Sequence, residues 1–358
     1  MLLPLVLIGL GRGSGTVRAE TDPQADRGAE PAPESMLYPP GLDARTIDAI
    51  GMGLKYLAQS QSRDGSWRSQ GAMGGYPVAM TSLAGLAMLA SGSTATQGAY
   101  APNVSRAASY LMQASGPNGL IALPEESARP MHGHGFALLF LGELYGTEAD
   151  EQRQRELKAV LDRAIKLTAR AQSQAGGWLY TPDANADEGS VTVTQVQGLR
   201  ACRNAGITVP KQVIDNALDY LDESQQPDGG IAYRLGQHGS RPAISAAAVV
   251  CWFNAGFYEN ENVVKALDYC KKKVLVTDNA RSGFLGHYFY GHLYMAQSMY
   301  LSGPSDFNDY FPKIRNDLLQ RQLKDGSWNG DGVGRVYGTA VALVILQLPY
   351  SYLPIMQR

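Results

Sequence analysis

The sequence predicts an all-α fold, an (α/α)6 toroid in which six helical hairpins close into a ring. The first observation is a turn that recurs at intervals of 54, 57, 53, 54 and 43 residues, marked by Gly65, Gly119, Gly176, Gly229, Gly283 and Gly326. The second is that an amphipathic helical pattern before each turn alternates with one after it that is apolar nearly all round. Helices that are apolar on every side must be enclosed, and a closed ring encloses them completely.

The outer helices are predicted from the stretches before the turns. In residues 43–60 the apolar side chains Ile50, Leu54 and Leu57 fall on one helical stripe, and residues 210–224 repeat this pattern. A helix of this kind buries one face and leaves the other in water. We therefore assign these stretches to an outer layer.

The inner helices are predicted from the stretches after the turns. Residues 79–90 (AMTSLAGLAMLA) and 244–256 (ISAAAVVCWFNAG) have almost no polar face. Residues that suit the end of a helix follow six such patterns: Gly92, Gly146, Gly206, Gly256, Gly303 and Pro349. The connections from an outer to an inner helix are the long ones, and long loops are where binding residues tend to lie.

The recurring turn is predicted to be a structural clasp. Its glycine can adopt positive φ, its tryptophan can pack as a flat plug between hairpins, and its glutamine can satisfy groups at a helix end. The residues assigned to this role are Gln61, Gly65, Trp67, Gln172, Trp178, Gln225, Gly229, Gln322, Gly326 and Trp328. None of these side chains is an acid, a base or a nucleophile, so a catalytic role is not expected of the turn.

The N-terminal residues predict export. Residues 2–10 are apolar but too short to span a bilayer, and Val17 and Ala19 are spaced like a signal-peptidase site. We expect a signal peptide at 1–19, a disordered Pro/Glu-rich tether at 20–41 and the toroid at 42–358, in a protein of the periplasm or cell envelope. Because no Lys or Arg precedes the apolar run, a misassigned start or a lipid-facing anchor stays open as an alternative.

Composition narrows the functional classes. The chain is 44% hydrophobic, with a net charge of −2 and a pI near 6.2, so it lacks the basic field that holds nucleic acid phosphates. Its three cysteines cannot form a disulfide framework, and we expect them to be small buried side chains. The sequence contains no Gly-x-Ser-x-Gly, His-Glu-x-x-His or Walker motif, and we expect neither a cofactor nor a metal.

The turns QSRDGSW, QAGGW, QPDGG and QLKDGSW resemble the Gln-Trp repeats of squalene and hopene cyclases and the related repeats of protein prenyltransferase β subunits. The resemblance covers about residues 43–350 and implies the six-hairpin toroid that these families share. Residues 132–146 and 334–358 are most similar to bacterial squalene-cyclase-like repeat proteins that carry export signals. The repeats are specific for the fold and do not imply a reaction.

The resemblance also points to one candidate acid. The cyclases protonate an alkene with an Asp-x-Asp-Asp cluster, and the nearest match here is Asn185, Asp187 and Glu188, before the third inner helix. Only Asp187 matches by identity, so the resemblance implies Asp187 as the candidate; the alternative is that Asp187 and Glu188 are N-terminal helix charges. The zinc-binding Asp and Cys of the prenyltransferases are missing before the fourth inner helix, which disfavours protein prenylation.

A second candidate site gathers where the inner helices begin. All five histidines lie in the long loops or first turns of inner helices, and an arginine precedes the second, fourth and sixth inner helix. Six helix N-termini would add positive partial charge there, which suits an anionic or polar head group. The predicted ligand-binding residues are Arg129, His132, His134, Arg241, Tyr288, Tyr290, His292, Arg335 and Tyr337, with His287 as a second catalytic candidate. Alternatively, the arginines pair with Glu125, Asp187 or Asp331.

These observations lead to one preferred function and two alternatives. We expect a ring that binds a hydrophobic or isoprenoid-like ligand, with a polar head where the inner helices begin. The alternatives are a polysaccharide lyase or hydrolase on the same toroid, and a protein-interaction ring. A deep apolar cavity favours the first, a wide polar cleft the second, and a plugged centre with an exposed apolar patch the third.

Overall fold

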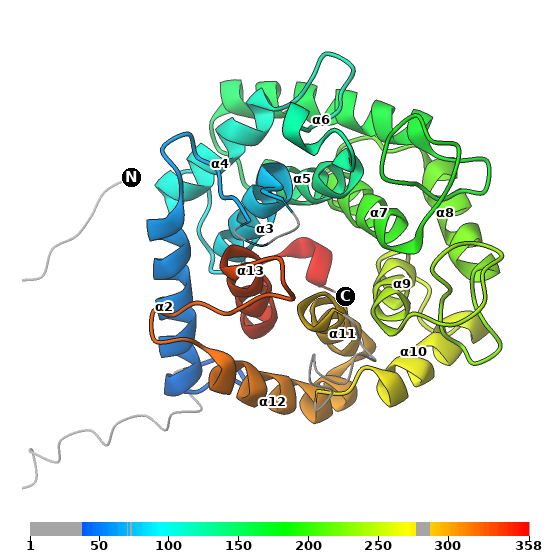
Figure 1. Cartoon of the computed structure of the whole chain (residues 1–358). Coiled ribbons are helices and arrows are strands. Elements are labelled where there is room, and N and C mark those ends of the chain that lie inside the picture. The colour runs from blue at the N-terminus through cyan, green and yellow to red at the C-terminus, as the bar shows by residue number, and fades with distance from the viewer. Residues whose placement is uncertain (1–37, 70, 72–73, 277–286, 358) are drawn as a thin grey trace, which may run out of the picture.

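The computed structural model describes residues 38–357 except 70, 72–73 and 277–286, so the predicted signal peptide and the turn at Gly283 lie outside the described residues. Twelve α-helices in the described part of the chain alternate between an outer and an inner ring (Figure 1). The outer helices are α2 (Ala44–Ser60), α4 (Ala101–Gln113), α6 (Glu151–Ala171), α8 (Lys211–Glu223), α10 (Glu261–Lys273) and α12 (Pro304–Arg321). The inner helices are α3 (Pro77–Leu89), α5 (Pro130–Tyr145), α7 (Gly189–Asn204), α9 (Pro242–Asn254), α11 (Tyr288–Ser302) and α13 (Arg335–Leu346).

The inner helices form a closed circle. Each packs against the next in chain order, and α13 packs back against α3 and α2, which joins the two ends of the chain. Every residue of α3 and α9 is buried, whereas α8 buries one stripe that includes Ile214, Leu218 and Leu221. The predicted toroid is therefore confirmed, and its two layers follow from the two hydrophobic patterns of the sequence.

Each described Gln-containing turn joins one outer helix to another. Gln61 Nε2 donates to the carbonyl of Gly65 (2.9 Å) within its turn and to that of Asn103 (3.0 Å) in the first turn of α4. The same pair of bonds, one to the turn and one to another outer helix, is made by Gln172, Gln225 and Gln322. One amide thus closes the turn and fixes the angle between neighbouring repeats.

The glycine of the turn is required by two constraints. Gly176 has a φ of +89°, and a Cβ there would lie 2.2 Å from the carbonyl oxygen of Asn216 in α8. The same left-handed backbone and close approach to an outer helix occur at Gly65, Gly119, Gly229 and Gly326. The tryptophan beside it is fully buried, as at Trp178, whose Nε1 donates to Thr168 O (2.8 Å) at the end of α6. The turn has the geometry of a structural clasp.

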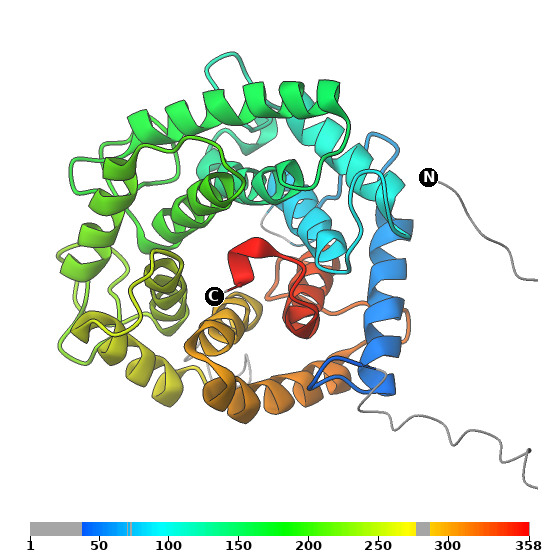
Figure 2. The ribbon, with the colours of Figure 1, turned by 180° about the vertical axis from the view of Figure 1, so that it is seen from behind.

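The C-terminal segment turns back into the ring. After α13, η2 (Leu348–Tyr350) and η3 (Pro354–Met356) carry the chain to the ring centre, where it lies in both views (Figure 1 and Figure 2). We call residues 351–357 the tail. Ile355 and Met356 are buried, and η3 contacts α7 and α11. The tail follows the last turn of α13, so it closes the end of the ring at which the inner helices finish.

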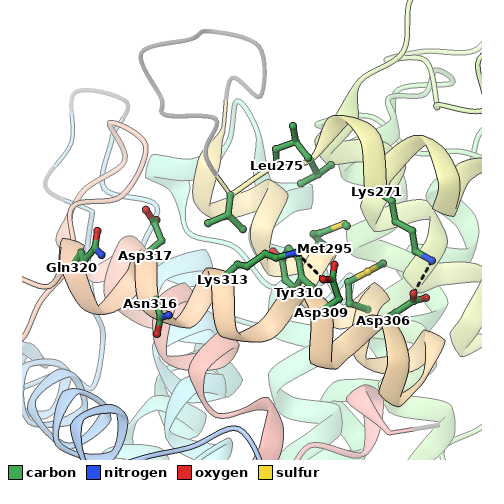
Figure 3. Close-up of a pocket in the computed structure, with 13 residues that line it drawn as sticks. Lys271, Leu275, Met295, Asp306, Asp309, Tyr310, Lys313, Asn316, Asp317 and Gln320 are labelled. Carbon is green, nitrogen blue, oxygen red and sulfur yellow. Dashed lines mark hydrogen bonds and ion pairs between the residues drawn. The ribbon is translucent and has the colours of Figure 1, made fainter.

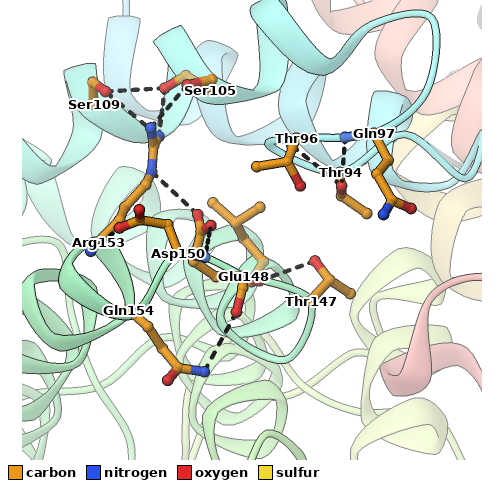
Figure 4. A network of polar contacts seen from close by, with 11 residues as sticks. Thr94, Thr96, Gln97, Ser105, Ser109, Thr147, Glu148, Asp150, Arg153 and Gln154 are labelled. Atoms are coloured by element: carbon orange, nitrogen blue, oxygen red, sulfur yellow. Dashed lines mark hydrogen bonds and ion pairs between the residues drawn. The ribbon is translucent and has the colours of Figure 1, made fainter.

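A polar network attaches α6 to α4 at this same end (Figure 4). Arg153 donates to Ser105 Oγ (2.8 Å) and to Ser105 O (2.7 Å), and its Nε lies 3.2 Å from the carboxylate of Glu148. Asp150 accepts from Arg153 N (2.7 Å) and caps α6. A cavity of about 520 Å³ beside these residues is part of this outer wall. None of the described helices is both long enough and apolar enough to cross a membrane.

Candidate ligand-binding site

We call the end of the ring at which the inner helices begin the mouth. Carboxylates occupy three of its helix N-termini: Glu126 accepts from a backbone N–H of α3 (3.1 Å), Glu188 from α7 (2.7 Å) and Asp331 from α11 (2.8 Å). Burial raises the pKa of each of these carboxyl groups, while the helix N–H groups act in the opposite direction. The other three inner helices begin at Arg129, Arg241 and Arg335.

The mouth is therefore mixed in charge. Half of the helix N-termini that were expected to attract an anion already hold a carboxylate of this chain. The expectation that the N-termini of all six inner helices attract an anionic ligand is therefore not met. The positive charge of the mouth comes from its arginine side chains.

Glu188 is the centre of a hydrogen-bond network at the mouth. Its carboxylate accepts from Ser190 Oγ, at 2.6 and 2.8 Å from the two carboxylate oxygens, and from the backbone N–H of Val191. The Tyr233 side chain is a third donor that lowers its pKa. Ser190 Oγ in turn lies 3.1 Å from His132 Nε2 on α5. The network joins α5, α7 and the loop before α9.

Three arginines surround a pair of tyrosines beside this network. Tyr180 and Tyr233 share a hydrogen bond between their hydroxyl groups. The guanidinium of Arg129 lies 4.8 Å from the ring centre of Tyr180, and those of Arg234 and Arg241 lie 5.7 and 5.9 Å from that of Tyr233. Arg129 and Arg241 are exposed and Arg234 is half-buried. No ion pair of these arginines is found within the described ranges, so their charge is available to a ligand.

Aromatic side chains line the ring below the mouth. Tyr290 and Tyr294 of α11 meet edge to face with ring centres 5.0 Å apart. Burial raises the pKa of Tyr290, and the nearby Tyr294, Glu188 and Tyr337 raise it further. The hydroxyl of Tyr290 is buried and has no hydrogen-bond partner among the described residues. A buried donor without a partner is costly, so this hydroxyl suits an acceptor on a ligand.

A second cavity lies away from the ring axis, between α10, α11 and α12 (Figure 3). It measures about 480 Å³, and Met295 is part of its floor. Its outer edge carries the ion pairs Lys271–Asp306 and Lys313–Asp309, both at 2.8 Å. Because its charges are already paired with one another, it offers less to a polar ligand than the mouth does. Within the described ranges no group of three or more His, Cys, Asp or Glu residues could hold a metal ion.

Comparisons with known proteins identify the fold. No family model matches the chain. The type II terpene cyclase MstE from Scytonema, solved with its product merosterolic acid A, is 13% identical and covers 86% of this chain and 97% of its own, with a TM-score of 0.60. The chain has the fold of the type II terpene cyclases.

Two further matches show how far this likeness extends. A stretch of 101 residues is 32% identical to drimenyl diphosphate synthase from Streptomyces showdoensis, which is 28% of this chain and 18% of the synthase. An α-1,6-mannanase from Salegentibacter, solved with α-1,6-mannotriose, has a TM-score of 0.61 at 10% identity over 84% of this chain and 98% of its own. The chain thus spans less than a fifth of the length of its curated relative, and the terpene cyclase fold is shared with a glycosidase.

Two of the predicted histidines lie in the wall of this terpene cyclase fold and not at the mouth. His134 Nδ1 accepts from the backbone N–H of Ile121 (3.1 Å), and its Nε2 contacts Thr168 of α6 (2.9 Å). His292 is equally buried, and its Nδ1 contacts the hydroxyl of Tyr310 in α12 (2.7 Å). Both side chains point to the outer layer.

The position of His134 and His292 within their repeats explains why these side chains face the outer layer. In the first repeat Trp67 N donates to Thr81 Oγ1 (3.0 Å), the fifth residue of its inner helix. The fifth residue of α5, α11 and α13 is His134, His292 and Thr339 respectively, and the fourth residue of α7 and α9 is Thr192 and Ser245. Thr192, Ser245 and Thr339 accept from the clasp in the same way, so His134 takes the place of a hydroxyl residue in the clasp.

Two more predicted residues, Tyr288 and Arg335, are engaged outside the mouth. The hydroxyl of Tyr288 is hydrogen-bonded to Asp317 of α12, with Arg321 stacked 4.4 Å from its ring centre. Arg335 forms an ion pair with Asp325 of its own clasp at 2.8 Å, and Asp325 is not one of the acidic partners that were predicted for the arginines. These side chains support the outer layer and are left out of the candidate site.

The two catalytic candidates also have defined places. Asp187 Oδ1 accepts from the hydroxyl of Tyr220 in α8 (2.9 Å) and from Leu235 N (3.2 Å), so it binds the outer layer. The carboxylate that joins the mouth network is the adjacent Glu188. His287 is exposed at the N-cap of α11, near Asp331. Neither side chain reaches the network around Glu188.

Several mouth residues were missed by the sequence analysis, namely Tyr180, Ser190, Tyr233 and Arg234. A signal for two of them was present, because each tyrosine stands four residues after a clasp glycine in the matching segments GGWLY and GGIAY. Two equivalent positions in neighbouring repeats of a ring must come close together.

Proposed function

We propose that this protein binds an isoprenoid-like ligand through the mouth of the ring. The polar head would lie at Arg129 and Arg241, and the hydrocarbon chain would run down the aromatic side chains of Tyr290, Tyr294 and Tyr337. The observation that carries the proposal is a succession of two layers along the inner helices. Arg129 and Arg241, without an ion pair among the described residues, stand at the N-caps of α5 and α9, and the aromatic side chains of α11 follow, including the hydroxyl of Tyr290 that has no partner among those residues. An amphiphile matches both layers.

The structural neighbours support this proposal. MstE has been solved with geranylgeranyl dihydroxybenzoate as substrate and with merosterolic acid A as product, so an isoprenoid enters this fold in another protein. In the present chain the tail closes the opposite end of the ring, which directs a ligand to the mouth.

Glycoside hydrolysis is less well supported by the site. That reaction needs two carboxyl groups that face one glycosidic bond, one as acid and one as base or nucleophile. The three carboxylates of the mouth, Glu126, Glu188 and Asp331, are each occupied by a helix N-terminus of this chain. They hold the inner helices in place and are poorly disposed to transfer a proton to a sugar.

Export is also proposed, on the sequence of residues 1–19 alone. Cell fractionation, with N-terminal sequencing of the mature protein, tests it. We expect cleavage after residue 19 and recovery outside the cytoplasm. An intact N-terminus on cytoplasmic protein would remove this part of the proposal.

Thermal unfolding in the presence of candidate ligands tests the binding proposal. A ligand at 100 times its Kd stabilises a protein by about 2.7 kcal/mol, which for a chain of this size raises Tm by several degrees. We expect farnesol or geranylgeraniol to raise Tm, and Tyr290→Ala to abolish the effect. Arg335→Ala is the matched control, because its guanidinium is paired with Asp325 away from the mouth. A rise with α-1,6-mannotriose and none with isoprenoids would favour the glycosidase alternative.

A further inference from the structure

The hydrogen-bond network at the mouth has a fixed direction. A serine hydroxyl carries one proton, and Ser190 Oγ lies 2.6 and 2.8 Å from the two oxygens of the Glu188 carboxylate. An ionised carboxylate can only accept, so the proton of Ser190 is directed to Glu188. Towards His132, 3.1 Å away, Ser190 can therefore only accept.

Burial, the largest influence on Glu188, raises the pKa of its carboxyl group, while the polar groups around it favour the ionised form. The carboxylate is the N-cap of α7 and accepts from Val191 N (2.7 Å), at the positive end of that helix. Tyr233 is a further donor to it, and the charge of Arg234 favours ionisation. The donors all converge on Glu188, and none of them requires it to carry a proton.

The tautomer of His132 follows from this direction. Its Nε2 must carry the proton that is donated to Ser190. Burial, with the charge of Arg129, lowers the pKa of His132 to about 4, so the ring is neutral near pH 7 and Nδ1 bears no proton. Nδ1 has no hydrogen-bond partner in the part of the chain that the structure describes, and the ring is partly exposed. His132 therefore presents a single bare acceptor.

Arg129 supplies the opposite function beside it. Arg129 is the N-cap residue of α5, three positions before His132, and its guanidinium lies over Tyr180 (4.8 Å) without an ion pair among the described residues. A guanidinium can only donate hydrogen bonds, and a bare imidazole nitrogen can only accept one. One hydroxyl group satisfies both, because its oxygen accepts from Arg129 and its proton goes to His132 Nδ1.

We propose that Arg129 and His132 select a ligand whose polar head carries a free hydroxyl, so that the isoprenoid-like ligand is an alcohol or phenol. This inference rests on the proposed function and specifies the substrate class of the same site. An ether or a hydrocarbon has no proton for His132. A diphosphate meets Arg129 but brings anionic oxygens against the lone pair of Nδ1.

The test compares farnesol with farnesyl methyl ether, which has the same chain and lacks the hydroxyl proton. We expect farnesol to bind the native protein about tenfold more tightly, the scale of one buried hydrogen bond. In His132→Phe the ratio of the two Kd values should fall to near one, with the affinity for the ether retained. Arg335→Ala serves as the control, which keeps the native ratio because its side chain pairs with Asp325.

The outcomes separate this inference from the proposed function. Equal binding of alcohol and ether by the native protein overturns the hydroxyl inference and leaves isoprenoid binding intact. Tighter binding of farnesyl diphosphate than of farnesol overturns it as well, in favour of an anionic head. If no isoprenoid binds, the proposed function fails and this inference fails with it.

A direct measurement does not depend on the folding of a variant. Nitrogen-15 NMR of the histidine-labelled native protein distinguishes the protonated from the bare ring nitrogen. At pH 7 we expect His132 to carry its proton on Nε2. In Ser190→Ala, which lacks the acceptor for that proton, we expect the proton to be distributed between Nε2 and Nδ1. A proton on Nδ1 in the native protein would overturn the proposed role.

Discussion

Glu143 offers the sharpest test of how the ring is closed. It lies on α5 beneath the tail, where its side chain is buried and the backbone N–H of Ile355 is its hydrogen-bond donor. One carboxylate oxygen has no partner among the described residues. Burial raises the pKa of Glu143 from 4.5 to about 8, so the folded protein holds this carboxyl group in its neutral form at pH 7.

The magnitude follows from linkage. The unfolded chain releases the proton of Glu143 above pH 4.5, whereas the folded chain keeps it until about pH 8. Between these values the free energy of unfolding falls by about 1.4 kcal/mol per pH unit. The contribution of Glu143 is fully present below pH 4.5, about 3 kcal/mol of it is lost by pH 7, and the loss is complete above pH 8.

The substitution Glu143→Gln keeps the shape of the neutral carboxyl group and cannot ionise. We expect it to raise the free energy of unfolding by about 3 kcal/mol at pH 7 and to have little effect at pH 4. Urea unfolding at several pH values measures the difference between the two proteins. The protection of residues 353–357 from hydrogen exchange, relative to the intrinsic rate at each pH, should fall above pH 8 in the native protein only, because ionisation of Glu143 weakens the contact between α5 and the tail.

The control is Glu259→Gln, in an exposed loop, which should change stability by less than about 0.5 kcal/mol at any of these pH values. If the difference between Glu143→Gln and the native protein is the same at pH 4 and pH 7, the reasoning is refuted. A variant that is less stable than the native protein at pH 7 would refute it as well.

Three further predictions concern the clasp. Gly176→Ala should destabilise by more than Gly206→Ala, because both glycines have positive φ but only a Cβ at Gly176 meets a backbone carbonyl; urea unfolding of the pair gives the comparison. Trp178→Ala should cost about 3–5 kcal/mol, since the ring is fully buried, and a loss of less than 1 kcal/mol would contradict its role as a plug. Arg335→Ala should cost less than about 1 kcal/mol, because its ion pair with Asp325 is exposed to solvent; unfolding at high salt, where the native protein should approach the variant, is the check.

The clasps and the ring were predictable because their signals are local. Gln61, Gly65 and Trp67 stand close together in the sequence, and their spacing reappears near Gln322 and Trp328. Within each repeat, the distribution of hydrophobic residues around the helix distinguishes the one-sided outer helix from the inner helix that is apolar all round. A repeat of this kind predicts closure as well, since each unit leaves an apolar face that only another unit can cover.

The candidate site was predictable only in part. His132 and Arg129 lie at the mouth and Tyr290 lies just below it, but His134, two residues after His132, faces the outer layer because it takes the clasp position of its repeat. Asp187 and Glu188 are adjacent in the sequence and point to different layers. The direction of a side chain in the first turn of a helix depends on the conformation of the loop that precedes the helix. That conformation cannot be predicted from the composition of the loop.

The sequence by itself determined the number of hairpins, their order and the chemistry of the clasp, because these depend on residues within one repeat of each other. Only the tertiary structure decided that Glu188, and not Asp187, serves the mouth, that Tyr180 meets Tyr233 across two repeats, and that Ile355 in the tail covers Glu143. The last two of these contacts join residues that are far apart along the chain, and the curvature of the ring, which arises from the packing of all six inner helices together, brings them close.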